Sequence, residues 1–103
     1  GAEDDVAIFT TAIDNIRPAV EVRSKRVGGA TYQVPKEVKR ERQQSLAIRW
    51  MVDNARKKVG KPMANRLADE LADAFENRGA SVTQKINVHK MAEANKAYSH
   101  FSW

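Results

Sequence analysis

The sequence predicts a mainly α-helical protein, a helical bundle with one protruding β-hairpin arm. Apolar residues recur at three- and four-residue spacing along most of the 103 residues, as they do on the buried side of amphipathic helices. Residues 19–38 instead alternate apolar and polar side chains on both sides of Gly28-Gly29, the pattern of two strands joined by a tight turn. We find no internal repeat and no linker, so residues 1–103 are expected to form a single domain.

A first helix is expected over residues 3–16. Three acidic residues at its start, Glu3, Asp4 and Asp5, suit the positive end of a helix dipole. Pro18 should end it, because the residue before a proline avoids helical angles. The stripe expected to face the core consists of Val6, Ile8, Phe9, Ala12, Ile13 and Ile16.

The hairpin is expected over residues 19–38. Gly28 and Gly29 lack a Cβ atom and therefore adopt the positive φ angles that a two-residue hairpin turn requires. The alternating apolar positions of the two strands are Val20, Val22, Tyr32 and Val34.

Three further helices are expected, over residues 41–58, 62–78 and 82–101. At about 100° per residue, the helix over 41–58 has an apolar side opposite a row of arginines. The apolar side holds Ala47, Ile48, Met51, Val52 and Ala55, and the row is Arg42, Arg49 and Arg56. Trp50, at the edge of the apolar side, is expected to pack in or near the core.

Local signals mark the ends of the last two helices. Pro62 suits the first turn of the helix over 62–78, and Gly79 is expected to cap its end. Ser81 and Gln84 have the spacing of a capping box for the last helix. The buried stripe of the helix over 62–78 should consist of Met63, Leu67, Leu71, Ala74 and Phe75.

Positive charge is concentrated in one part of the chain. The net charge is +5, and residues 17–58 hold twelve Lys and Arg against four acidic residues. Such a concentration is typical of a surface that binds nucleic-acid phosphates, although a solvated basic face is the alternative. The predicted nucleic-acid-binding residues are Arg23, Lys25, Arg26, Lys36, Lys39, Arg40, Arg42, Arg49, Arg56, Lys57 and Lys58.

We expect no enzymatic activity, no cofactor and no metal. The chain has no cysteine, no phosphate-binding loop and no nucleophile elbow, and no apolar run approaches the length of a membrane span. His89 and His100 would stand about 16 Å apart along one helix, too far to share an ion with Glu93. The aromatic cluster of Tyr98, Phe101 and Trp103 either pins the last helix to its domain or stacks on RNA bases.

Two long segments carry a family resemblance. Residues 20–35, VEVRSKRVGGATYQVP, and residues 91–101, MAEANKAYSHF, resemble the hairpin and the C-terminal signature of bacterial-type small-subunit ribosomal protein seven. Between them the matching segments are LAIRWMV (46–52), ARK (55–57) and RLADEL (66–71), in the family's order and spacing. The chain is thereby identified as similar to that family from about residue 6 to its C-terminus.

The resemblance implies a structural constituent of the small ribosomal subunit. Members of the family bind the 3′ major domain of small-subunit rRNA and support assembly of the head. Their hairpin lies near the exit-site tRNA, the path of mRNA and small-subunit ribosomal protein eleven. The implied location is the ribosome of the bacterial cytoplasm, or that of a mitochondrion or plastid.

The chain also departs from the family. The family is usually longer, with a basic N-terminal tail, so this chain is expected to represent its C-terminal two-thirds. Its first residue is Gly1 rather than Met, which suggests a processed or truncated start. The segment TQKINV (83–88) replaces a lysine-rich run, and Ser102 stands where a basic residue is common.

Two other classes of protein remain open from the residues alone. An architectural DNA-binding protein can also combine a helical body with basic β-arms, although an apolar wedge is common at the tips of such arms and is missing here. A protein-interaction domain with a solubilising basic face is the other alternative.

Overall fold

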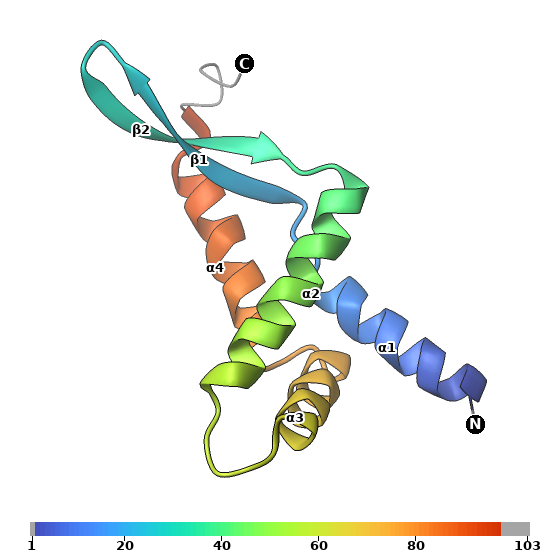
Figure 1. The fold of residues 1–103 in the computed structure, drawn as a ribbon. Coiled ribbons are helices and arrows are strands. Elements are labelled where there is room, and N and C mark those ends of the chain that lie inside the picture. Colours follow the sequence, from blue (N-terminus) through green and yellow to red (C-terminus); the bar gives the residue numbers. More distant parts are fainter. Residues whose placement is uncertain (1, 98–103) are drawn as a thin grey trace.

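The computed structural model describes residues 2–97, with side chains from residue 4 onward. Four helices surround a small core, and a two-stranded antiparallel hairpin projects from it (Figure 1). The elements are α1 (Ala2–Ile16), β1 (Val20–Val27), β2 (Ala30–Glu37), α2 (Arg40–Lys57), α3 (Met63–Phe75) and α4 (Ala80–Ala94). The predicted fold class is confirmed, and most predicted boundaries lie within one to three residues of the observed ones.

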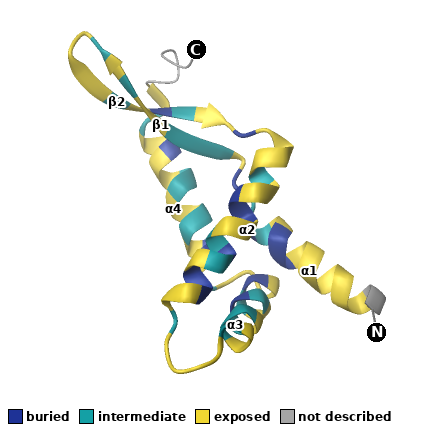
Figure 2. Cartoon of the chain, viewed as in Figure 1, coloured by how far each residue is buried: buried dark blue, intermediate teal, exposed yellow. Residues whose placement is uncertain are grey.

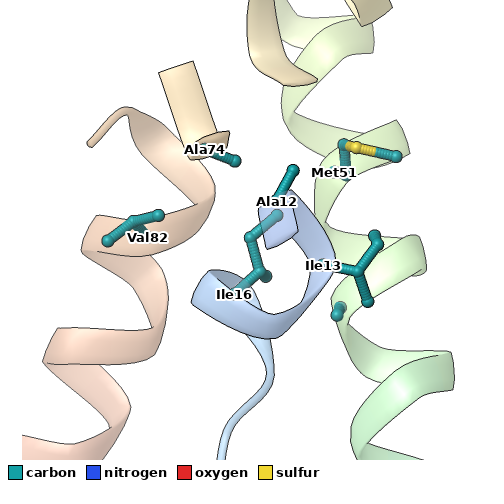
Figure 3. Packing of buried hydrophobic residues seen from close by; sticks show 7 residues of the cluster. Ala12, Ile13, Ile16, Met51, Ala74 and Val82 are labelled. Atoms are coloured by element: carbon teal, nitrogen blue, oxygen red, sulfur yellow. The ribbon is translucent and has the colours of Figure 1, made fainter. Parts of the chain in front are cut away.

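The core is small and draws on all four helices. Three side chains of α1, those of Ala12, Ile13 and Ile16, insert between the other helices (Figure 3). They meet Ala47 and Met51 of α2, Ala74 of α3 and Val82 of α4. Trp50 and Leu71 pack against this cluster from its edge, so the near-core position predicted for Trp50 is confirmed.

The predicted apolar stripes are only partly buried. In α1 the first half of the stripe is exposed, with Val6 at 64% and Phe9 at 40%, because this half of the helix extends away from the body (Figure 2). Ile8 is exposed as well, and so are Ile48 of α2 and Phe75 at the end of α3. Periodicity predicted the correct side of each helix, but the packing of neighbours decides how far along that side burial extends.

The connection between α3 and α4 differs from the predicted one. α3 ends at Phe75, and Asn77 takes the positive φ of 58° that Gly79 was expected to supply. The amide of Asn77 bonds to Ala74 O and that of Arg78 to Asp73 O, both at 2.9 Å, the two bonds of a Schellman cap. Gly79 is the N-cap of α4, where a Cβ atom would lie 2.8 Å from Asp73 Cβ.

The capping box predicted at Ser81 and Gln84 is wrong. α4 begins one residue before Ser81, and the Ser81 side chain turns into the protein. Its hydroxyl donates to Glu70 Oε1 at 2.7 Å, and its amide donates to the same oxygen at 3.0 Å. Asn54 Nδ2 donates to both Ser81 Oγ and Gln84 Oε1 at 3.1 Å. A buried polar network satisfies these groups in place of a helix cap.

Glu70 is the charged centre of this network. The residue is fully buried, and Lys58 Nζ lies 3.1 Å from its Oε2. Burial raises the pKa of Glu70. The Ser81 hydrogen bonds and the Lys58 cation lower it by a larger amount, so the pKa lies below its usual value. The carboxylate therefore stays charged inside the fold and ties α2, α3 and α4 together.

Within the described residues, the last helix ends earlier than predicted. α4 closes at Ala94 with Asn95 as its C-cap. The aromatic cluster of Tyr98, Phe101 and Trp103, together with His100, lies outside the described residues.

The hairpin has the predicted turn. Val27 pairs with Ala30, which leaves Gly28 and Gly29 as a two-residue loop with φ angles of 60° and 86°. Both angles are positive, as a type I′ turn requires.

The base of the hairpin is held from three sides. Val38 N donates to Ala19 O at 3.0 Å, which continues the strand pairing beyond the ladder. Gln43 Nε2, in the first turns of α2, donates to Val38 O at 2.8 Å. The amide of Ala19 donates to His89 Nε2 of α4 at 3.1 Å. The arm is therefore fixed to both α2 and α4.

His89 has a structural role at the base of the hairpin. Burial, assisted by the neighbouring charge of Lys85, lowers its pKa, which favours the neutral imidazole that can accept the Ala19 bond.

Replacing Glu70 with Ala is expected to lower the free energy of unfolding by about 3 kcal/mol, because Lys58 and both Ser81 donors lose a buried partner. Urea titration measures the change. Glu76→Ala removes an exposed carboxylate just beyond α3 and should change stability by less than about 0.5 kcal/mol. Equal effects of the two substitutions would contradict a structural carboxylate at Glu70.

The same carboxylate should make stability depend on acidity. An unfolded glutamate titrates near pH 4.3, and the folded pKa of Glu70 is lower. Its contribution is therefore complete above about pH 4.3 and is lost as the pH falls through the folded pKa. The urea midpoint should fall more steeply between about pH 5 and pH 3 in the parent chain than in Glu70→Ala. Parallel curves would show that Glu70 is not the group responsible.

Candidate nucleic-acid interface

Strand register sorts the basic residues of the arm onto two faces. Lys36 pairs with Glu21 across the ladder, so these two residues lie on the same face. Arg23 and Lys25 follow Glu21 at two-residue intervals along β1 and share that face. Arg26 falls on the opposite face, next to the turn. Three of the four predicted cations of the hairpin therefore share one side.

This face meets the start of α2 at a pocket. Its lining consists of Glu21, Arg23, Lys36, Glu37, Val38, Lys39 and Arg42. Four of the eleven predicted binding residues are thus brought together from β1, β2, the connection after β2, and α2. Buried Val38 carries the chain directly from the strand into the helix, which is why residues far apart in sequence converge here.

A carboxylate that sequence reasoning did not single out lies within this pocket. Glu21 Oε1 accepts a hydrogen bond from Arg23 Nε at 2.6 Å, and its Oε2 accepts one from Arg42 Nε at 2.9 Å. Burial raises the pKa of Glu21, but the two arginines outweigh this and leave it below the usual value. The spacing of Glu21 and Arg23 on one strand face was a sequence signal for the first pair. The second depends on tertiary structure.

The arginine row extends this basic surface along α2. Arg42, Arg49 and Arg56 are all exposed and span about 21 Å of helix, as 14 residues at 1.5 Å rise require. Arg56 lies 3.7 Å from Asp53, a contact with little energetic weight at an exposed site. Within residues 4–97, no acidic side chain is paired with Arg49 or Lys57. Both cations are available to a ligand.

The remaining predicted cations differ in their surroundings. Arg40, although exposed, lines a second pocket between α1 and α2 together with Asp14 and Arg17. Lys58 is engaged within the protein, because its ammonium group lies 3.1 Å from Glu70 and 3.9 Å from Asp73. Lys58 thus pairs with the buried network, whereas Arg42 lines the pocket beside the arm and the exposed cations of α2 extend from Arg42 to Lys57.

The described residues offer few other sites. No group of three His, Asp or Glu side chains between residues 4 and 97 is placed to hold a metal ion. No helix in the described part of the chain is both long and apolar enough to cross a membrane.

Fold and charge together define a class: a small helical protein with a cationic β-arm whose basic surface continues along one helix. The model of one family, described as Ribosomal protein S7p/S5e, matches residues 1–96. The chain belongs to that family, which confirms the resemblance seen in the sequence.

Similar proteins from several bacteria bear the name small ribosomal subunit protein uS7. The protein of Aeromonas salmonicida is 61% identical over 101 residues, which cover 98% of this chain and 65% of the relative. That of Gluconobacter oxydans is 59% identical over 100 residues, covering 97% of this chain and 63% of the relative. That of Fervidobacterium nodosum is 55% identical over 101 residues, covering 98% of this chain and 65% of the relative. The chain thus spans somewhat less than two thirds of the length of these relatives.

Proposed function

We propose that this chain is a structural, non-enzymatic component of the small ribosomal subunit that binds small-subunit rRNA through the arm and α2. The observation that carries the proposal is the convergence of Arg23, Lys36, Lys39 and Arg42 in one pocket, from which the exposed arginine row continues. Family membership and the names of the relatives support the same function. The site of action is the ribosome, in the bacterial cytoplasm.

In binding of this kind, affinity and specificity come from different features of the RNA. Lys and Arg contacts to phosphates supply affinity and orientation without reading sequence. Side chains cannot enter the deep, narrow major groove of an RNA helix, so the shape of the folded rRNA supplies most of the specificity. An arm fixed at its base suits this task, because its cations keep a defined spacing relative to those of α2.

The rRNA domain that is bound and the molecules that lie near the hairpin are assigned from the family resemblance. We propose the 3′ major domain of the rRNA as the binding site, with a contribution to assembly of the head. The hairpin would lie near the exit-site tRNA and the mRNA path, with small-subunit ribosomal protein eleven as a neighbour.

The chain should bind a folded fragment of the 3′ major domain of small-subunit rRNA much more tightly than duplex DNA of equal length. Filter binding or fluorescence anisotropy at fixed salt measures both affinities, because phosphate contacts depend on ionic strength. Equal affinities would support an architectural DNA-binding protein instead. No affinity for either polymer would favour a protein-interaction domain.

Replacing Arg42, Arg49 and Arg56 by Gln should flatten the salt dependence of RNA binding while the helical circular dichroism is retained. Each lost phosphate contact should lower the slope of log affinity against log salt by roughly 0.7 to 0.9. A control that replaces Lys61, Arg78 and Lys90 removes the same charge from other surfaces and should change the slope less. An unchanged slope in the first variant would show that α2 faces away from RNA.

A further inference from the structure

Glu21 occupies an unexpected place for an acidic residue. It lines the pocket in which four cations of the proposed rRNA surface converge. Considered by charge alone, a carboxylate at this position repels phosphate and should weaken RNA binding. Its contacts indicate a different role.

The carboxylate is enclosed while its two partners are not. The Glu21 side chain is 14% exposed, whereas those of Arg23 and Arg42 are 51% and 48% exposed. Each carboxylate oxygen accepts one hydrogen bond, and both bonds come from the Nε atom of an arginine. A guanidinium has five N–H donors, so each arginine keeps its Nη groups for another acceptor. Glu21 therefore joins the two guanidinium groups without consuming the donors that suit a phosphate.

We propose that Glu21 is a positioning residue that holds Arg23 and Arg42 together as a clamp for an RNA backbone phosphate. The inference rests on the proposed rRNA binding and extends it to a residue whose charge alone argues against such a role. It also assigns the phosphate a place, between the arm and the first turn of α2.

The physical reason is the entropy of long side chains. A free arginine loses rotamer freedom when it binds a phosphate, and that loss weakens binding. Arg23 and Arg42 are already restrained by Glu21, so much of this loss has occurred before RNA arrives. The carboxylate neutralises only one of the two guanidinium charges, and Lys36 and Lys39 line the same pocket. The clamp therefore remains cationic.

Glu37 provides a matched comparison. It lines the same pocket and lies one residue from Lys36 on β2, but it is exposed. Among the described side chains, no cation is paired with it. Removing its charge should therefore reduce repulsion of phosphate and leave the arginines where they are.

The test compares Glu21→Gln with Glu37→Gln in the 103-residue chain, by affinity for the 3′ major domain rRNA fragment across a range of salt. Both substitutions remove one negative charge from the same pocket. Glu21→Gln is expected to weaken binding about threefold to tenfold and Glu37→Gln to strengthen it about twofold. Glu21→Asp, which keeps the charge but draws the carboxylate back by one methylene, should weaken binding as well. Glu21→Gln binding as tightly as Glu37→Gln would overturn the inference.

A mutant cycle separates positioning from a general loss of structure. In a chain that already carries Arg23→Gln and Arg42→Gln, adding Glu21→Gln should cause no further loss of affinity, because Glu21 acts through those arginines. A further loss would overturn the proposed route of action. Thermal unfolding of each variant, followed by circular dichroism, reports whether the fold is retained. Failure of the parent chain to bind the RNA would instead reject the proposed function, which keeps the two failures distinct.

Discussion

The connection from β2 to α2 is the constraint on which the basic surface depends. Val38 is buried there, its N–H bonds back to Ala19 across the base of the hairpin, and its carbonyl accepts from Gln43 inside the helix. A flexible linker at this point would let the arm swing, and its cations would keep no fixed distance from those of α2. The three restraints instead make the arm and helix one unit, so the pocket lined by Arg23, Lys36, Lys39 and Arg42 exists before any ligand binds.

Two carboxylates illustrate how burial changes the use of a charge. Glu70 is enclosed, and removing one partner of such a buried pair costs about 3 to 5 kcal/mol, so its bonds to Ser81 and Lys58 hold helices together. Glu21 pairs with half-exposed arginines, where an ion pair contributes only about 0 to 1 kcal/mol of stability. An energy of this size is nevertheless comparable to the cost of ordering a long side chain on binding. Restraining that side chain in advance saves about 0.5 to 1.5 kcal/mol.

Local chemistry in the sequence predicted the features that depend on neighbouring residues. Gly28-Gly29 predicted the turn of the hairpin, and Pro18 predicted the end of α1. The seven-residue spacing of three arginines predicted the exposed row on α2. The prediction failed where a distant residue competes for a local signal. Ser81 had the spacing of a helix cap, but buried Glu70, eleven residues earlier, is a better acceptor for its hydroxyl. Glu21 could be linked to Arg23 through strand periodicity, whereas its bond to Arg42 spans 21 residues and depends on how β2 leads into α2.

The shape of the basic surface bears on how an RNA would be distinguished from other polyanions. Eight residues of strand extend about 26 Å, and the arginine row continues for about 21 Å along α2, so the cations trace a long path rather than a compact patch. A polyanion must follow that path to reach all of them. Phosphate contacts carry no sequence information, but a rigid set of cations favours the fold whose backbone follows the same path. Under the proposed function, rigidity at the hairpin base would convert general attraction into recognition of shape.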